Sequence, residues 1–439
     1  MSATIDASML VEFFGGDAAL VEVPGRMYPV TERDRSKDIA VSTAELLKEG
    51  HNVLVFQPGK AEIQRTISTL LRMNVDAEVF PLHSEMSLID QMPCFLPYPR
   101  PKCIVATNVA QTSITIPDID AVVDSGMERR SEYVDGVEGL YIRPTSLADR
   151  MQRKGRAGRT KPGIYIDFCP TEMSDRAMFS KAEVLCLPLE KVVLQLARAG
   201  VRIETLKFYH QPSEKTIQEA RNTLLAMGCI DKVGELTPIG TRVASLPVSA
   251  RFGRMLVEAE KRKVLSEMII LVSIMEQGGI TRDRELEVGK VSSWSDAFVQ
   301  MAAFVKASRL PFDYLEQNGI DSAAFTEAQM TSRRLQTALK HRVSTKHSVN
   351  AEKEIVCSLY AGLVDRLYKK SLVRGYKDSA GNLRNLPPGS VVANAERVVG
   401  LPWNLQVRSE FGPKTLRLIT MATRVDEKLF AQVVPGRVP

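Results

Sequence analysis

Residues 53–73 read VLVFQPGKAEIQRTISTLLRM, and this stretch decides the class of fold. It begins with a short apolar run over 53–57 and continues into a helical pattern over 60–73. Further short, β-branched runs lie along the first half of the chain, at 77–81 (AEVFP), 103–107 (CIVAT), 121–124 (AVVD) and 164–168 (IYIDF). Strands that alternate with helices predict a mainly parallel sheet covered on both faces. We therefore expect an α/β lobe over residues 31–170.

The pattern becomes helical after Pro170 and strand-like again near residue 365. Within 181–230, EKVVLQLARAG ends at Gly200 as a helix C-terminus does, and TIQEARNTLLAMGCI followed by DKVGELT predicts a helix and a hairpin. That order indicates a winged-helix unit. Residues 250–360 are almost wholly helix-like. The last part holds short strand-like runs that suit a small barrel of the oligonucleotide-binding (OB) type: LVRGYKD, SVVANAE, NLQVRSE and LRLITMATRV.

The composition is that of an ordered chain with several modules. With 439 residues, 44% hydrophobic and 25% charged, the sequence fits three or four domains of ordinary size. It shows neither a long apolar run nor a secretory signal, so we expect no membrane span. The six cysteines are scattered without a CxxC pair, which argues against zinc and disulfides and favours a reducing cytoplasm.

Positive charge is concentrated at the C-terminal end. From Arg366 onward the chain has 13 Lys and Arg against 5 Asp and Glu, a net charge of +8, whereas the whole chain carries +6. A basic module on a near-neutral body indicates that one end binds a polyanion. A solvated basic face would have the same composition, and charge alone favours neither reading.

The strongest chemical signal is Gln152-Arg-Lys-Gly-Arg-Ala-Gly-Arg159. A helix over this stretch would place Gln152, Arg156 and Arg159 on one face. Gly155 and Gly158 are poor helix formers, so we expect a backbone or a phosphate to approach them closely. Two guanidinium groups and an amide suit a phosphoryl group in transfer. The alternative, a basic surface patch, fits the position between a βαβ pattern and the strand GIYIDF less well.

Polar residues follow three of the predicted strands. Ala106-Thr-Asn-Val-Ala-Gln-Thr-Ser-Ile-Thr115 is a hydroxyl- and amide-rich loop after one strand, and Asp124 ends the next. Ligands of α/β sheets bind at the carboxyl ends of strands, where Thr107, Asn108 and Thr112 could bind phosphate or ribose oxygens. Ordinary capping explains any one of these residues but not the whole run. After the first strand, the amide of Gly59 at a helix start could bind a backbone phosphate, although a plain β–α loop explains it equally well.

Together these runs resemble the second motor lobe of DEAH-box helicases of superfamily 2. VFQPGKAEI is similar to that family's motif IV, ATNVAQTSIT to motif V and QRKGRAGRTKPG to motif VI. Ser2-Ala3-Thr4 resembles motif III, and residues up to 30 resemble the end of the first lobe and the connection between lobes. The resemblance implies a RecA-like lobe over 31–170, a winged-helix domain over 171–248, a helical ratchet domain over 249–362 and an OB-fold-like domain over 363–439.

The resemblance also implies roles for individual residues. Gln152, Arg156 and Arg159 would face the γ-phosphate of ATP as water-positioning and arginine-finger residues. Phe95 would stack on the adenine, unless it is simply a core residue, and Asp124 would lie near the nucleotide. Gly59, Thr107, Asn108 and Thr112 would contact the nucleic-acid backbone, and Ser2 and Thr4 would couple the two lobes.

The sequence departs from the family in two ways. Position 111 is Gln where the family usually has Glu, which puts the coupling role of that position in doubt. The sequence also contains neither a GxxxxGK[ST] motif nor a DExH tetrad; Asp426-Glu427 is followed by Lys-Leu. We therefore predict no metal ligands in this chain. The cofactors would be ATP and Mg²⁺, with the Mg²⁺ ligands on a first lobe that lies outside this sequence.

Three readings of function follow. In the favoured one, the chain is the C-terminal portion of a cytoplasmic ATP-dependent RNA helicase, or a nuclear one if the source is eukaryotic. It would supply arginine fingers and the second half of a single-strand channel, and an activator protein could dock on its C-terminal modules. In the second, it is a stand-alone nucleic-acid-binding module without ATPase activity. In the third, a separate chain completes the ATPase. Single-stranded RNA is the expected substrate in each, with DNA as the alternative.

Overall fold

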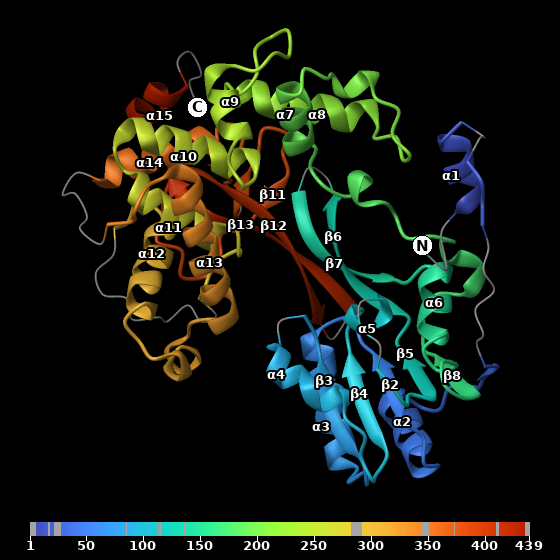
Figure 1. The fold of residues 1–439 in the computed structure, drawn as a ribbon. Coiled ribbons are helices and arrows are strands. Elements are labelled where there is room, and N and C mark those ends of the chain that lie inside the picture. Colours follow the sequence, from blue (N-terminus) through green and yellow to red (C-terminus); the bar gives the residue numbers. More distant parts are fainter. Residues whose placement is uncertain are drawn as a thin grey trace. The chain divides into compact units, whose positions relative to one another are not determined.

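The chain folds into two units (Figure 1), which are described separately. Unit 1 consists of Met1–Glu132 and Leu140–Glu183, and unit 2 of Tyr133–Gly139 and Val184–Pro439. The computed structural model describes residues 6–15, 18–21, 28–84, 86–112, 114, 116–134, 137–281, 292–344, 351–372, 374–409 and 412–434.

Unit 1 contains a six-stranded parallel sheet with the order β1-β8-β5-β2-β4-β3. Its strands are β1 (Val30–Glu32), β2 (Val53–Phe56), β3 (Glu78–Leu82), β4 (Lys102–Ala106), β5 (Ala121–Asp124) and β8 (Gly163–Asp167). The prediction of an α/β lobe with a parallel sheet is confirmed, and the five strand-like runs match β2, β3, β4, β5 and β8 to within one residue at each end.

The central strands of this sheet are buried on both faces. Val53 and Val55 of β2 point into one core, which includes apolar residues of helices α2 (Ile39–Lys48) and α3 (Lys60–Arg72). Leu54 and Phe56 point into a second core on the opposite face. Successive side chains of a strand alternate between faces, so a strand covered on both sides needs apolar residues at every position. This explains the uninterrupted run VLVF.

The remaining helices of unit 1 are short. They comprise α1 (Ala7–Phe13), α4 (Leu88–Gln91), α5 (Val109–Thr112) and α6 (Leu147–Lys154), with 3₁₀ turns at Met92–Phe95 and Met173–Asp175; a third, Glu183–Leu185, lies where the chain passes into unit 2. Helix α6 begins at a side-chain cap, because the Ser146 hydroxyl accepts a hydrogen bond from the Asp149 amide at 3.0 Å. This cap fixes where the helix that carries Gln152 and Arg153 starts.

A β-hairpin, β6 (Met127–Val134) and β7 (Val137–Pro144), belongs to both units. Its outer end, Tyr133–Gly139, groups with unit 2. There the Tyr133 amide donates to the Cys186 carbonyl at 2.7 Å, and Arg366 donates to the Tyr133 hydroxyl at 3.3 Å. The tip of the hairpin is therefore held by residues of unit 2.

The first part of unit 2 is a small helical group with its own core. Helices α7 (Glu190–Arg198), α8 (Glu214–Ala226) and α9 (Pro238–Ala244) pack around Leu194, Leu224 and Val243. Helix α7 is followed by Gly200 at φ +72°, which confirms the predicted helix end. Where a hairpin was expected, a single antiparallel bridge joins Ile230 and Leu236.

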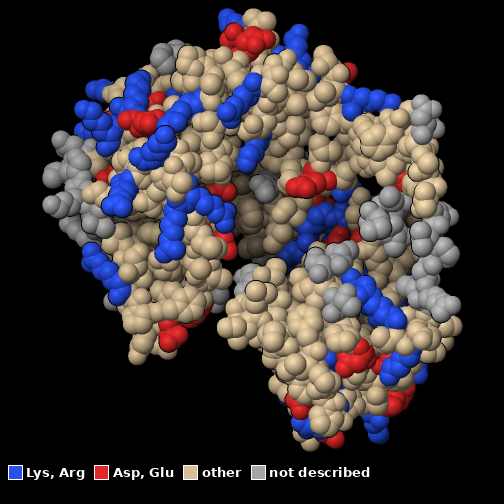
Figure 2. All heavy atoms as spheres, in the orientation of Figure 1, with Lys and Arg blue, Asp and Glu red and all other residues tan. Residues whose placement is uncertain are grey.

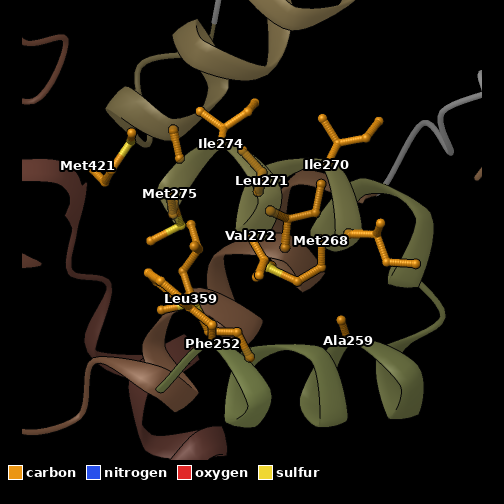
Figure 3. Close-up of a cluster of buried hydrophobic side chains, with 14 of the residues drawn as sticks. Phe252, Ala259, Met268, Ile270, Leu271, Val272, Ile274, Met275, Leu359 and Met421 are labelled. Carbon is orange, nitrogen blue, oxygen red and sulfur yellow. The ribbon is translucent and has the colours of Figure 1, made fainter. Parts of the chain in front are cut away.

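The largest core of the chain lies among the next five helices (Figure 3). They are α10 (Ala250–Arg262), α11 (Leu265–Met275), α12 (Asp296–Ala307), α13 (Ser322–Leu339) and α14 (Ala351–Gly362). Helix α11 supplies Met268, Leu271 and Val272, and the labelled Phe252 and Leu359 reach the same cluster from α10 and α14. Almost every side chain of α11 is buried, which explains its continuous apolar sequence.

The C-terminal strands form a curled mixed sheet. They are β9 (Leu367–Lys370), β10 (Tyr376–Lys377), β11 (Leu383–Arg384), β12 (Arg397–Ser409) and β13 (Gly412–Arg424), and helix α15 (Glu427–Val433) follows. Strands β12 and β13 pair antiparallel along their whole length, and β12 also lies beside β7 in the strand order. Two strands of 13 residues each are much longer than the short runs predicted.

One strand prediction is wrong. Residues 390–396 (SVVANAE) lie in turns, because the Ser390 hydroxyl and the Val391 amide donate to the Asp296 carboxylate at 2.8 Å each. Side-chain hydrogen bonds of this kind offer the backbone an alternative to a strand ladder. Along the part of the chain that the structure describes, we find no helix with both the length and the apolarity to span a bilayer.

Candidate functional site

The candidate site lies at the carboxyl edge of the sheet in unit 1. Phe56, the last residue of β2, is in register with Ala106 of β4 on one side and with Asp124 of β5 on the other. The residues that follow these strand ends therefore share one edge. The structure thus brings together Gly59, the Thr107–Asn108 turn and Asp124.

Gly59 is the N-cap of helix α3 and lies close to two charged side chains. A Cβ at this position would stand 3.0 Å from Glu62 Oε2 and 3.2 Å from the Arg129 guanidinium. The backbone is extended there, with φ −168°, so it adds no strain for other residues, and a Cβ would meet only the ends of two flexible side chains. Backbone amides at a helix start are a ready binding site for phosphate.

The turn after β4 is held to the sheet at its first residue. The Thr107 amide donates to the Leu82 carbonyl of β3 at 3.1 Å, and the Gln111 amide donates to the Asn108 carbonyl at 2.9 Å. Thr107 is half-buried and Asn108 is exposed. Thr112 lies in the helical turn α5, and its side chain is outside the described structure. The turn thus presents polar groups at the edge of the sheet.

A buried ion pair lies beneath this turn. The Arg153 Nη1 atom is 2.8 Å from Asp124 Oδ1, and the two side chains are 1% and 0% exposed. The second oxygen of Asp124 accepts a hydrogen bond from the Tyr165 hydroxyl at 2.9 Å, and the Arg153 guanidinium lies 4.8 Å from the Phe56 ring centroid. In this conformation Asp124 anchors Arg153, and its nearness to a nucleotide stays a prediction.

Gln111 connects the turn to helix α6. Its Oε1 accepts from Arg153 Nε at 2.9 Å, and its Nε2 donates to Asp149 Oδ1 at 2.6 Å and to Gln152 Oε1 at 3.4 Å. The residue where the sequence departs from the family is therefore a fully bonded, buried amide.

Arginines of α6 also bind the ends of two other strands. Arg150 contacts Glu32, the last residue of β1, at 2.6 Å, and Asp167, the last residue of β8, at 2.7 Å. With Arg153 on Asp124, the last residue of β5, the helix is joined to three adjacent strand ends. Hydrogen bonds from Arg150 and Lys154 lower the pKa of Glu32. This arrangement fixes the position of α6 and of the segment that follows it.

The helix expected across 152–159 is wrong, because α6 ends at Lys154. Gly155 caps it, and the chain continues as a turn in which Arg156 and Ala157 donate to the Arg153 and Lys154 carbonyls. The chain then passes close to the segment before β1, and a Cβ on Gly158 would lie 2.6 Å from the Tyr28 carbonyl oxygen. The sequence predicted that a backbone or a phosphate approaches a glycine of this motif closely. At Gly158 the close neighbour is the backbone at Tyr28.

The three predicted catalytic residues have different surroundings. Gln152 is half-buried and lies against Gln111, while Arg159 is exposed. Arg156 is buried and donates to the backbone carbonyls of Gln111 and Ile114. Burial, together with the charge of Arg159, lowers the pKa of Arg156 to about 10, so its guanidinium stays protonated at neutral pH.

The remaining predicted residues lie elsewhere. Phe95 ends a 3₁₀ turn and packs, partly buried, against the core that contains Leu54 and Phe56. The carbonyls on either side of it, of Cys94 and Leu96, accept hydrogen bonds from Lys102 at the start of β4, not at its end. Its stacking on adenine stays a prediction. Ser2 and Thr4 fall outside the described residues.

Two residues of the network were not singled out from the sequence. Arg153 lies inside the predicted motif, but its partner Asp124 is 29 positions away. Asp149 is three residues after Ser146, a spacing typical of a helix start, which could have indicated the cap but not the contact of Asp149 with Gln111. In the described ranges, no group of three or more His, Cys, Asp or Glu is placed to hold a metal ion.

Known proteins resemble the chain both in this lobe and beyond it. Residues 37–161 match the family model of the helicase conserved C-terminal domain. The ATP-dependent RNA helicase HrpA of Escherichia coli K12 is 34% identical over 298 residues, which cover 62% of this chain and 23% of HrpA. The Drosophila melanogaster ATP-dependent RNA helicase DHX33 is 30% identical over 299 residues, which cover 62% of this chain and 43% of DHX33.

Solved structures match the fold over nearly the whole chain. The crystal structure of the E. coli DExH-box NTPase HrpB has a TM-score of 0.75 at 26% identity and covers 99% of this chain and 51% of that one. The chain thus spans about half the length of that solved relative and 23% to 43% of the curated relatives above. Unit 1 has a RecA-like parallel sheet. The chain is thus similar over residues 37–161 to the helicase conserved C-terminal domain, and over its whole length to about half of an E. coli DEAH/RHA helicase, HrpB.

Proposed function

We propose that this chain is the C-terminal portion of an ATP-dependent RNA helicase. In this proposal Gln152, Arg156 and Arg159 face the γ-phosphate of ATP, and the turn at Thr107 and Asn108 binds the nucleic-acid backbone. The observation that carries the proposal is the contact of Arg156 with the carbonyls of Gln111 and Ile114. This contact joins residues 152–159, the arginine segment, to residues 107–111, the polar turn. An enzyme that couples phosphate chemistry to strand binding requires such a connection.

The residues present fit a phosphate better than a metal. A guanidinium has five N–H groups, so Arg156 can hold two carbonyls and still donate to a phosphate oxygen. Arg159 is exposed on the same turn, and two such cations would neutralise charge on the transferring group. Bound Mg²⁺ would neutralise charge on the phosphates. In this proposal its ligands and the adenine-binding contacts other than Phe95 belong to a first motor lobe outside this sequence, and Ser2 and Thr4 couple the two lobes.

We assign the modules of unit 2 to single-strand binding. Three separate apolar cores support a winged-helix domain over 171–248, a helical ratchet domain over 249–362 and an OB-type domain over 363–439. Charge supports the same role: Figure 2 shows more Lys and Arg than Asp and Glu on the visible face of unit 2, and residues 328–351 contain no acidic residue. A basic surface of this kind attracts a nucleic-acid backbone with little regard to sequence.

ATP turnover tests the phosphate-binding part of the proposal. The purified chain is mixed with ATP, Mg²⁺ and poly(U), and compared with the double variant R156A/R159A. We expect no turnover above the variant, because half of an electrostatic clamp does little catalysis. Turnover by the chain that disappears in the variant would show that the chain holds phosphate and magnesium by itself, and the assignment of a separate first lobe would be wrong.

RNA binding tests the other part. A fluorescent single-stranded oligouridylate should bind with an affinity that falls steeply with salt, because Lys and Arg displace counterions. Replacing Thr107 and Asn108 by Ala should weaken binding on the order of tenfold and leave the salt dependence unchanged, since both side chains are neutral. The matched control is Ser68→Ala with Thr69→Ala on α3. Equal affinity in all three proteins would remove the turn from the binding site.

The alternative of a stand-alone binding module shares the RNA result. It predicts that ATP analogues do not bind to the chain and that R156A/R159A leaves nucleotide binding and RNA binding unaltered. Weak binding of a fluorescent ATP analogue that R156A/R159A abolishes would favour the helicase portion. An unchanged signal would favour the module.

A further inference from the structure

Gln111 contacts four positions of the segment that runs from α6 to Arg156. Its side chain bonds Asp149, Gln152 and Arg153, and its backbone carbonyl accepts from Arg156. The side chain is 7% exposed, so these bonds form away from water. The residue stands three positions after Asn108, in the turn that begins at the end of β4. One amino acid therefore joins the polar turn to the arginine segment.

The amide of Gln111 satisfies both neighbours of its side chain, whereas an ionised carboxylate would not. The Arg153 guanidinium can only donate, and an ionised Asp149 can only accept, so position 111 must accept on one side and donate on the other. Burial alone would raise the pKa of Asp149, but hydrogen bonds from Ser146, Ser180 and Gln111 and the charge of Arg153 lower it. Asp149 is therefore ionised at neutral pH. A glutamate at 111 would place a second carboxylate against it.

Among the described residues, the cations near that second carboxylate already have other partners. Arg153 already bonds Asp124, and Arg156 bonds two carbonyls. Arg130, which donates to Ser180, is paired with Glu128. On the other side of Asp124 lies the Tyr165 hydroxyl. Asp149 takes its other hydrogen bonds from Ser146 and Ser180, which are neutral. An added negative charge at 111 would share Arg153 with Asp124 and repel Asp149.

We propose that Gln111 is a positioning residue that transmits the state of the polar turn to Gln152 and Arg153, and that the amide at 111 and the carboxylate at 149 are a matched pair. The amide of Gln111 stands where the family that the sequence resembles usually has a glutamate. The coupling rests on the proposed function, in which the turn binds nucleic acid and the arginine segment binds phosphate. The matched pair itself rests only on the hydrogen bonds.

The matched pair is tested by an isosteric exchange. Gln111→Glu should lower the unfolding midpoint of unit 1 by roughly 4 °C at pH 8. The loss should shrink at pH 5, because two adjacent carboxyl groups then share a proton and the raised pKa of the new acid favours the folded state at low pH. In the double variant Q111E/D149N, an asparagine amide can donate to the new carboxylate, so the midpoint should return toward the original at pH 8.

Two results would overturn the matched pair. One is a Q111E protein as stable as the original at both pH values, and the other is a double variant no more stable than Q111E alone. If Q111E does not fold at pH 8, recovery in the double variant still tests the pairing. Asp149→Asn alone and the exposed Gln64→Glu on α3 are the controls for a lost and for an added charge.

The positioning role is tested by RNA binding at pH 8. Q111E should weaken binding of oligouridylate about fivefold, the double variant should restore it, and Gln64→Glu should have no effect. If the stability cycle shows the pairing while RNA affinity is the same in all variants, Gln111 is structural and the positioning role is wrong. If the original chain does not bind RNA at all, the proposed function fails, whereas the stability cycle still decides the pairing.

Discussion

Asp124 and Arg153 form an ion pair with 2.8 Å between Oδ1 and Nη1, and neither side chain is more than 1% exposed. The carboxylate ends strand β5 and the guanidinium belongs to helix α6, so the pair fixes the helix to the edge of the sheet where the candidate site lies. Each charge is fully bonded, to Gly126, Tyr165, Met127 and Gln111 as well as to its partner.

Breaking this pair should be costly. Arg153→Met leaves a buried carboxylate without its cation, which should lower the free energy of unfolding by about 3–5 kcal/mol. The double variant R153M/D124N should be less destabilised than R153M, because no unpaired charge remains. Urea denaturation of unit 1 measures both. Arg33→Met is the control, since Arg33 and Glu49 pair at the surface, where such pairs contribute about 0–1 kcal/mol. Equal losses in R153M and R33M would contradict the role of burial.

Replacing Arg156 should lower the stability of the protein more than replacing Arg159. Arg156→Ala leaves the carbonyls of Gln111 and Ile114 without a donor and should cost about 1–3 kcal/mol. Arg159→Ala removes an exposed side chain and should change stability by less than about 0.5 kcal/mol. Both variants should weaken binding of a fluorescent ATP analogue. Stability is read by urea denaturation and binding by anisotropy; an Arg159→Ala loss as large as that of Arg156→Ala would show that Arg159 also supports the fold.

Gly158→Ala should destabilise unit 1. Its Cβ would stand 2.6 Å from the Tyr28 carbonyl oxygen and 2.7 Å from Val30 Cγ2, so the segment before β1 would have to shift. We expect a loss of about 1–3 kcal/mol in urea denaturation. Gly50→Ala is the matched control: its φ is +90° but no atom lies within 4 Å of the new Cβ, so only backbone strain is added. A larger loss of stability in Gly50→Ala than in Gly158→Ala would mean that the segment at Tyr28 shifts at little cost in free energy.

Cys169 should be the first thiol to react in the native protein. It is partly exposed, while the other five cysteines are buried. Burial raises the pKa of the Cys94, Cys229 and Cys357 thiols to about 11 and that of Cys103 further, which leaves little thiolate at pH 8. Iodoacetamide labelling followed by peptide mass spectrometry checks the order. Earlier labelling of Cys103 or Cys229 would indicate that the core of unit 1 or unit 2 opens.

The sequence predicted the elements of unit 1 better than those of unit 2. Central parallel strands are apolar at nearly every position, so runs such as 103–107 are visible without any partner. Strand β12 could not be recognised from the sequence, because Gly400 and Pro402 interrupt its pattern. It forms nevertheless, because it pairs with β13. Local preference failed for 390–396 because Asp296, far away in the chain, binds that turn.

The site was predictable as a set of positions but not as a network. Parallel topology places the residues after β2, β4 and β5 at one edge, and that follows from a strand–helix alternation. The strand–helix alternation does not predict which arginine is buried. Arg153 is buried against Asp124, while Arg159, in the same motif, is exposed. That choice depends on where α6 ends and on the partners that Glu32 and Asp167 provide.

The shared hairpin has a consequence for how the chain can be divided. The backbone passes between the units at three places, after Glu132, after Gly139 and after Glu183, so no single cut yields two intact pieces. A fragment that ends at residue 183 would retain the tip around Tyr133 and Val137 but lose Cys186 and Arg366, which bond Tyr133. During synthesis, that tip emerges from the ribosome about 50 residues before Val184, and therefore before the rest of unit 2 has been made. Completion of unit 2 therefore depends on a piece of chain made in the middle of unit 1.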